Sequence, residues 1–173
     1  MGTKSLAKKI KRIAQLSGSF TLRSGEVSST YFDKYRFESD PQILLEIVQQ
    51  MQPMIPEGTE VLCGMEMGGI PIATMLSQVS CIPAAFIRKE AKAYGTCNYA
   101  GGTELTNKKI LIVEDVVSSG GAIIDGVSKM REDGVQVDTA ICVIDRRKSD
   151  ANALGDAGIS LKALFTMADL EDA

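Results

Sequence analysis

The sequence is organised around residues 110–123, which read ILIVEDVVSSGGAI. Four branched apolar residues come first without polar alternation, which is typical of a strand buried on both faces. Two acids follow, Glu114 and Asp115, and then a loop of small residues at 118–121. Beyond the loop, apolar residues recur at helical spacing, namely Ile123, Ile124, Val127 and Met130. The stretch therefore predicts a strand, an acidic pair, a small-residue loop and a helix.

The predicted loop has the features of a phosphate site. A helix N-terminus offers free backbone N–H groups, and Ser118 and Ser119 add two hydroxyls. The two carboxylates before the loop would repel a bare phosphate, so we expect a ligand with hydroxyls one sugar length from its phosphate. An ordinary strand–helix unit with an Asp at a turn is the alternative. Neither G-x-x-x-x-G-K-[ST] nor G-x-G-x-x-G occurs, which disfavours P-loop and dinucleotide sites.

The composition is that of a globular protein. The 173 residues are enough for one domain with a full core, and 45% hydrophobic and 24% charged residues are ordinary values. A net charge of −3 argues against a nucleic-acid partner. The four cysteines form no C-x-x-C pair and there is no histidine, so we expect free thiols in a reducing cytosol and no zinc site. Without a signal peptide or a span-length apolar run, we expect a cytoplasmic chain with no membrane contact.

Apolar stretches alternate with helical patterns along most of the chain. An amphipathic basic helix is predicted at 4–16, with a solvated charged face favoured over membrane contact. Asp40 and Pro41 are typical of a helix start. The predicted strands are 60–63, 83–87, 109–114, 135–144 and 160–166. We therefore expect an α/β fold with a mostly parallel five-stranded sheet flanked by helices, and ligands at the carboxyl ends of the strands.

Two further segments are candidates for ligand contact. Residues 20–37, FTLRSGEVSSTYFDKYRF, predict two short strands around a Ser-Gly turn and are rich in Arg and aromatics, which can hold a flat anion. A surface hairpin with aromatics in the core is equally compatible. Residues 88–107 are polar and Gly-rich with three cations near their start, which favours a mobile basic lid over a solvated linker. The Gly-rich turn at 64–71 is compatible with an anion site or with tight packing.

Residues 110–122 resemble the signature of the type I phosphoribosyltransferases, which use 5-phosphoribosyl 1-pyrophosphate (PRPP). The patterns F-T-L-x-S-G-x-x-S-x-x-Y-F-D at 20–33 and R-K-E-x-K-x-x-G at 88–95 resemble the orotate phosphoribosyltransferases. The resemblance covers roughly residues 18–147. It implies the type I fold with a small N-terminal hood at 1–40 and a single domain over 1–173. It further implies pentosyl transfer from PRPP to orotate in pyrimidine biosynthesis, Mg²⁺ as cofactor, and a homodimer with shared active sites.

The same resemblance assigns roles to individual residues. Lys92, Glu114 and Asp115 are the implied catalytic residues. Orotate contacts are implied for Arg23, Tyr31, Phe32, Ser118 and Arg146. No protein side chain is implied as a metal ligand, because Mg²⁺ is held mainly by PRPP. The implied PRPP-binding residues are Arg88, Lys89, Lys92, Tyr94, Glu114, Asp115, Val116, Val117, Ser118, Ser119, Gly120, Gly121 and Ala122.

The sequence also departs from the family pattern. Arg23 stands where members often have Lys, and Met67-Gly68 stand where some have Tyr-Lys. Tyr94 replaces a frequent His, which puts the catalytic rate in question, since a tyrosine is a poor proton shuttle near neutral pH. Two alternatives stay open: a phosphoribosyltransferase for another base, and a non-catalytic PRPP-sensing regulator. Such regulators often append a DNA-binding helix pair, which this sequence lacks.

Overall fold

The computed structural model describes residues 2–21, 25–89, 99–148 and 152–173. The predicted α/β fold is confirmed, although the central sheet has six strands rather than five, in the order β5-β4-β3-β6-β7-β8. All neighbouring strands are parallel except β5, which runs antiparallel to β4 at the edge. The strands are β3 (Val61–Met65), β4 (Ala84–Ile87), β5 (Ala100–Gly102), β6 (Ile110–Val117), β7 (Thr139–Asp145) and β8 (Ser160–Thr166).

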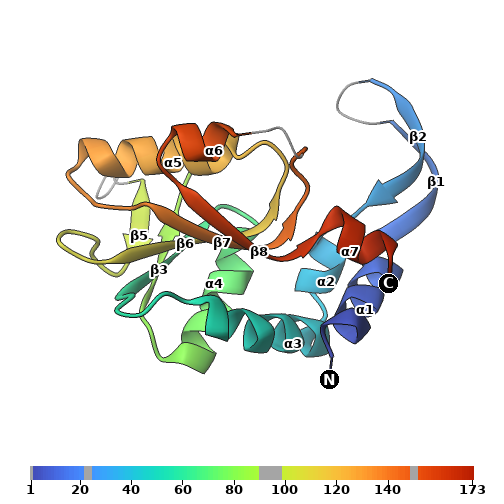
Figure 1. Ribbon diagram of the computed structural model, residues 1–173, viewed down its shortest axis with the longest axis horizontal. Helices are drawn as coiled ribbons and strands as arrows, with labels where there is room; N and C mark the ends of the chain where they lie inside the picture. The colour runs from blue at the N-terminus through green and yellow to red at the C-terminus, as the bar shows by residue number, and fades with distance from the viewer. Residues whose placement is uncertain (1, 22–24, 90–98, 149–151) are drawn as a thin grey trace.

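Helices cover both faces of this sheet and create two apolar cores. In Figure 1, α5 and α6 lie on one face, and α3 and α4 lie on the other. Leu111 and Val113 of β6 pack toward α3 and α4, whereas Ile112 packs toward α5, because successive side chains of a strand point to opposite faces. The helices are α3 (Pro41–Met51), α4 (Gly69–Ser80), α5 (Gly121–Glu132) and α6 (Ala153–Asp156), and a 3₁₀ turn η1 (Gln52–Met54) follows α3.

The N-terminal segment forms a helix and a hairpin beside one edge of the sheet (Figure 1). Its elements are α1 (Thr3–Ala14), the antiparallel strands β1 (Gln15–Thr21) and β2 (Val27–Phe32), and the short helix α2 (Tyr35–Glu38). The last helix, α7 (Met167–Glu171), lies against α1, and Lys11 Nζ donates to the Glu171 carbonyl at 3.0 Å. Leu6 and Ile10 of α1 are buried in the same core as α3 and α4.

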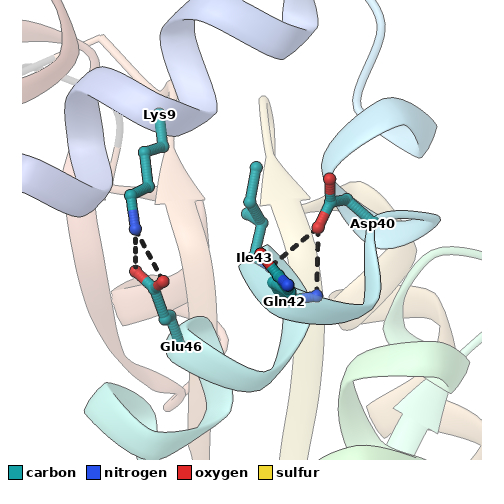
Figure 2. Close-up of polar contacts among 5 residues, drawn as sticks. All are labelled: Lys9, Asp40, Gln42, Ile43 and Glu46. Atoms are coloured by element: carbon teal, nitrogen blue, oxygen red, sulfur yellow. Dashed lines mark hydrogen bonds and ion pairs between the residues drawn. The ribbon is translucent and has the colours of Figure 1, made fainter.

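Figure 2 shows how α1 and α3 are held together and how α3 begins. Lys9 Nζ of α1 lies 2.6 Å from Glu46 Oε1 of α3. The Asp40 carboxylate accepts hydrogen bonds from the backbone N–H groups of Gln42 and Ile43, both at 3.0 Å. Asp40 is thus the N-cap that the sequence predicts, and it satisfies two of the N–H groups that a helix start leaves without partners.

Several boundaries differ from the sequence prediction. Strand β6 continues through the acidic pair to Val117 rather than ending at 114, and β3 ends at Met65 rather than at 63. Strand β5 lies inside the predicted lid at 88–107, where two glycines in three residues leave no strand pattern to detect. Strand β7 begins at Thr139 rather than at 135, since Arg131 binds the Val137 carbonyl at 2.9 Å in place of a neighbouring strand. Strand β1 begins at Gln15, inside the helix predicted for 4–16.

The remaining lid residues 90–98 lie outside the described part of the chain. Along the described segments, no helix has both the length and the apolar composition needed to cross a bilayer.

Candidate functional site

The loop between β6 and α5 surrounds a small cavity. This cavity measures about 190 Å³ and is lined by Glu114 and by residues 116–123. Gly120 caps α5 with φ 84°, a left-handed conformation that favours glycine. A side chain there would also approach Leu154 of α6 within 2.8 Å. The structure thus brings Glu114 together with the predicted phosphate loop at a helix N-terminus, which is the arrangement that binds a phosphate.

Asp115 occupies a different environment from Glu114. Its side chain is fully buried and does not line the loop cavity. Its Oδ2 lies 2.7 Å from Lys34 Nζ, and its Oδ1 accepts a hydrogen bond from the Val116 N–H at 2.6 Å. Gly68 covers the carboxylate so closely that a Cβ at this position would collide with Asp115 Oδ2. The two acids of the signature are therefore adjacent in sequence but only Glu114 faces the loop.

Glu114 and Glu38 have raised pKa values, whereas the pKa of Asp115 is lowered. Burial, together with the Asp115 charge, raises the pKa of Glu114 to about 9. Burial and a hydrogen bond to Asp115 raise the pKa of Glu38 to about 9. Burial opposes ionisation of Asp115 as well, but hydrogen bonds from Glu38 and Lys34 lower its pKa below the usual value. Near neutral pH the acid pair therefore carries one negative charge, on Asp115, and it repels an incoming phosphate less than two ionised carboxylates would.

A second cavity lies between the hairpin and the end of β7. It measures about 470 Å³, and its walls include Tyr31, Phe32 and Arg146 together with Lys11. The Arg146 guanidinium lies 5.8 Å from the centre of the Phe32 ring, a cation–π distance. Three of the predicted orotate contacts thus meet at one cavity. Of the other two, Ser118 lines the loop cavity and Arg23 lies outside the described residues.

The two arginines after β7 have different partners. Arg147 binds its own neighbour Asp145, with Nη2 2.8 Å from Oδ2, and this contact lowers the pKa of Asp145 against the effect of burial. In the described part of the chain Arg146 forms no ion pair, and its backbone N–H donates to the Val117 carbonyl at 2.8 Å. The salt-bridged arginine at this strand end is therefore Arg147, which leaves Arg146 directed at the hairpin cavity.

The aromatic side chains of the hairpin fit both interpretations of residues 20–37, namely contact with a flat ligand and packing in the core. Phe32 is half-buried and packs against the core beside Phe37. Tyr31 is 45% exposed and packs on Phe20, with ring centroids 5.5 Å apart. The hairpin therefore presents an aromatic surface to the cavity while one of its rings anchors it to the core.

A third cavity, of about 720 Å³, adjoins the end of β4. Arg88 and Lys89 line it together with the first turn of α5. The backbone N–H of Lys89 donates to Glu66 Oε1 at 3.2 Å, and Lys129 Nζ donates to the Lys89 carbonyl at 2.7 Å. The structure therefore brings two of the predicted pyrophosphate contacts to the same end of the sheet as the phosphate loop. Lys92 and Tyr94 lie outside the described residues.

The Gly-rich turn after β3 is tightly packed against neighbouring backbone. A Cβ at Gly64 would lie 2.7 Å from the Gly69 carbonyl, and one at Gly69 would collide with the Val113 carbonyl. These contacts let α4 approach β3 and β6 closely. Packing is therefore the interpretation that the structure favours for the turn at 64–71.

Other polar features lie away from these cavities. A cavity of about 530 Å³ at the amino ends of the strands is lined by Glu60, Lys109 and Asp138 among others, and it contains none of the predicted site residues. Parallel sheets bind ligands at their carboxyl ends, so we assign this cavity no role. Cys63 is a free thiol, and burial raises its pKa to about 12, so it is not a nucleophile near neutral pH.

Sequence reasoning missed Lys34 and Glu38, the two side chains that contact Asp115. Their spacing of four residues, typical of a helical ion pair, was the available signal. It was weak because the short helix α2 has too few residues for a clear apolar period. The structure shows instead that both side chains turn toward the acid on β6.

The described residues offer no donor set for a metal ion. Within the described ranges, no three acidic, cysteine or histidine side chains converge where they could hold an ion. A cation bound here would therefore take most of its ligands from a bound molecule and water, which is a common situation for Mg²⁺.

The comparisons with known proteins agree with this geometry. The family described as "Phosphoribosyl transferase domain" matches residues 42–157. An orotate phosphoribosyltransferase from Nocardioides sp. is 43% identical over 169 residues, covering 98% of this chain and 94% of the relative. One from Methanocella arvoryzae is 37% identical over 153 residues, covering 88% and 87%. The chain therefore belongs to the phosphoribosyltransferase family, and within it to the orotate phosphoribosyltransferases.

A solved structure supports the same assignment. The crystal structure of orotate phosphoribosyltransferase from Mycobacterium tuberculosis H37Rv, in complex with Fe(III) dicitrate, superposes with a TM-score of 0.85 and 27% identity, covering 97% of this chain and 98% of the other. The family resemblance and the fold class predicted from the sequence are thus confirmed.

Proposed function

We propose that the protein transfers the 5-phosphoribosyl group from PRPP to orotate, giving orotidine 5′-phosphate and pyrophosphate, a step of pyrimidine biosynthesis. One observation carries the proposal. The acid-and-loop cavity after β6, the aromatic cavity with Arg146 and the cations after β4 all lie at the carboxyl end of one sheet. The orotate phosphoribosyltransferases among its relatives support the choice of base.

PRPP would occupy the loop cavity and extend toward β4. Glu114 and Asp115 would hold the ribose, and the loop at 116–122 would bind the 5′-phosphate through backbone N–H groups and the hydroxyls of Ser118 and Ser119. Arg88 and Lys89 line the cavity beside the first turn of α5, which is suited to the pyrophosphate. The family resemblance adds Lys92 and Tyr94 to this set. In this scheme PRPP binding opens the cover over the Asp115 carboxylate on the Gly68 side, while its contact with Lys34 remains.

Orotate would bind at the aromatic cavity. Its ring would lie against Tyr31 and Phe32, and its carboxylate would pair with Arg146, a charge-assisted contact. Ser118 and Arg23 complete the set by resemblance. The unpaired guanidinium of Arg146 beside an aromatic ring, among the described residues, is what favours a carboxylated base.

Mg²⁺ fits this site as an ion bound to PRPP, since the described residues offer no cage for it. When bound, it neutralises part of the pyrophosphate charge. The residues of the chain stabilise the other charges that form during the reaction. Departure of pyrophosphate leaves positive charge on the anomeric carbon, which the Asp115 carboxylate stabilises. Arg88, Lys89 and Lys92 neutralise the leaving group, and the ring nitrogen of orotate attacks the anomeric carbon. Lys92 is the proposed proton relay.

The whole chain would form one domain, with residues 1–40 as hood and base-binding hairpin and 88–107 as mobile lid. The family resemblance further supports a cytoplasmic homodimer in which the lid of each subunit reaches the neighbouring site. Such a two-fold interface gives two equivalent sites.

A base panel tests the proposed reaction. Pyrophosphate release is measured with PRPP and Mg²⁺ for orotate, uracil, hypoxanthine and adenine, with a chelator as control. We expect release with orotate only, and none after chelation. Turnover of a purine without turnover of orotate would contradict the choice of base. PRPP binding without any release would indicate a regulator instead.

The variant Arg146→Ala tests whether Arg146 binds the carboxylate of orotate. Loss of a charge-assisted pair costs on the order of 2 kcal/mol, so the KM for orotate should rise about thirtyfold while the KM for PRPP stays nearly constant. Arg147→Ala is the matched control, since Arg147 pairs with Asp145 and should leave orotate binding intact. An equal rise of both KM values in the Arg146 variant would assign Arg146 to the fold.

A further inference from the structure

Three buried carboxyl groups and one partly exposed lysine form a cluster beside the loop cavity. The cluster, which we call the acid cluster, consists of Lys34, Glu38, Glu114 and Asp115. Glu38, Glu114 and Asp115 are 8%, 7% and 0% exposed, so three carboxyl groups are nearly removed from water. Lys34 supplies the amine, with Nζ 2.7 Å from Asp115 Oδ2.

The positive charge of Lys34 balances one negative charge in the acid cluster, so one of the three carboxyl groups is ionised and two are protonated. Burying an ionised carboxylate is costly unless a cation or hydrogen-bond donors compensate it. Asp115 has both, through Lys34 and through a protonated Glu38, whereas burial keeps the pKa of Glu38 and Glu114 at about 9. Lys34 is charged in this state because its contact with Asp115 raises its pKa against the effect of burial. The ionised acid of the pair is therefore the one that touches Lys34.

Lys34 comes from the segment that carries the base-binding residues. It lies directly between β2, which ends at Phe32, and α2, which begins at Tyr35. The Lys34–Asp115 ion pair thus ties the hairpin to the end of β6. On the other side of Asp115 stands Gly68, which has no side chain and leaves no room for one. Among the described residues, Lys34 is the cation that forms an ion pair with Asp115.

We propose that Lys34 is a positioning residue. It lies just after the strand that carries Tyr31 and Phe32, and it holds the Asp115 carboxylate ionised and oriented for the ribose. The proposal rests on the ribose role of Asp115 in the proposed function. Glu38 assists by donating its proton toward the same carboxylate. Lys34 touches no reacting atom in this scheme and acts through Asp115.

Steady-state kinetics of Lys34→Met test this role, with Lys34→Arg as the charge-retaining variant. Lys108→Met is the matched control, because Lys108 forms an exposed ion pair with Glu60 away from the site. We expect the kcat of Lys34→Met to fall at least about tenfold with less than about a threefold change in the KM for PRPP, since the carboxylate acts most on the charged transition state. Lys34→Arg should recover part of the loss, and Lys108→Met should match the wild type.

The pH profile gives a second readout. The titratable groups that face Asp115 are Lys34 and Glu38 from the α2 segment, Glu114 on β6 and the Cys142 thiol on β7. Removing Lys34 removes an effect that lowers the pKa of Asp115, so the acidic limb of the kcat profile should move to higher pH. A purely structural role of Lys34 would lower stability without moving this limb. An unchanged kcat and an unmoved limb in Lys34→Met would overturn the proposal.

A measurement on the wild-type protein covers the case in which Lys34→Met does not fold. The ¹⁵N NMR signal of the Lys34 ammonium is assigned by its absence in Lys34→Arg and is followed as PRPP is added. We expect the signal to remain protected from rapid proton exchange, because the ion pair persists in the complex. Loss of protection on PRPP binding would overturn the proposal. This readout does not depend on turnover, so absence of orotate activity contradicts the proposed reaction alone.

Discussion

Glu38 is an acid that the fold keeps in its neutral form. It is 8% exposed, and its pKa rises from an ordinary 4.5 to about 9, mainly because burial disfavours the carboxylate. Its neighbour Asp115 is ionised, so a second charge at Glu38 would face repulsion across a hydrogen bond. A buried neutral acid of this kind makes the stability of a protein depend on pH.

Glu38→Gln should therefore stabilise the protein at alkaline pH. Between pH 4.5 and about 9 the unfolded chain releases the Glu38 proton whereas the folded chain keeps it, so wild-type stability falls as pH rises through this window. Glutamine does not titrate but can still donate to Asp115. We expect the variant to gain about 1 kcal/mol or more relative to wild type between pH 5.5 and pH 8.5, measured by urea unfolding.

Glu60→Gln is the control for this measurement. The exposed Glu60 has a lowered pKa because of hydrogen bonds from Lys109 and Lys108, so its substitution should give no gain as pH rises. A difference between Glu38→Gln and wild type that stays constant with pH would show that Glu38 is ionised in the folded protein.

The site residues that could be predicted from the sequence are those that lie beside a recognisable local pattern, the apolar run of a strand. Glu114 follows the apolar run inside β6, and the loop and Arg146 each follow a strand, so an apolar run locates all three. Lys34 and Glu38 could not be found in this way. Their role depends on contact with Asp115, a residue far away in the chain, and their four-residue spacing predicts a helical ion pair rather than that contact.

At the scale of elements, predictions succeeded where packing and local propensity agree. The helix after Asp40 begins where its cap and Pro41 place it, and β6 begins with its apolar run but continues to Val117. The short edge strand β5 was not predictable, because backbone pairing with β4 rather than side-chain pattern defines it. Gly102, with φ 99°, comes so close to β4 that a Cβ would lie 2.8 Å from the Ala84 carbonyl.

The cap of α3 gives a test at this scale. Asp40→Ala removes the acceptor for the N–H groups of Gln42 and Ile43 and should lower the free energy of unfolding by about 1 kcal/mol. Asp40→Asn is the matched control, since asparagine caps about as well as aspartate. Thermal unfolding of both variants measures the effect. An equal loss in both would trace the effect to the charge of Asp40 rather than to its hydrogen bonds.

At the scale of the whole molecule, residues from distant parts of the chain meet at one end of the sheet. The hairpin, the end of β4, the β6 loop and the end of β7 each contribute to the proposed site. Because parallel strands run in the same direction, their carboxyl ends meet at one end of the sheet, and this convergence is predictable once the strands are located. The assembly of subunits is not predictable in this way, because one chain does not show which of its surfaces a second copy covers. The shared-site dimer therefore rests on the family resemblance and needs its own test.

Mixing two inactive variants provides that test. We expect Lys92→Ala and Asp115→Asn each to be inactive, because each removes a proposed catalytic residue. If the lid of one subunit completes the site of its neighbour, a mixed dimer has one site with both residues intact and one site that lacks both. Random exchange makes roughly half of the dimers mixed, so activity should recover to roughly a quarter of wild type. Each variant alone is the control, and native mass spectrometry verifies the exchange. Exchange without recovered activity would mean that the lid serves its own subunit.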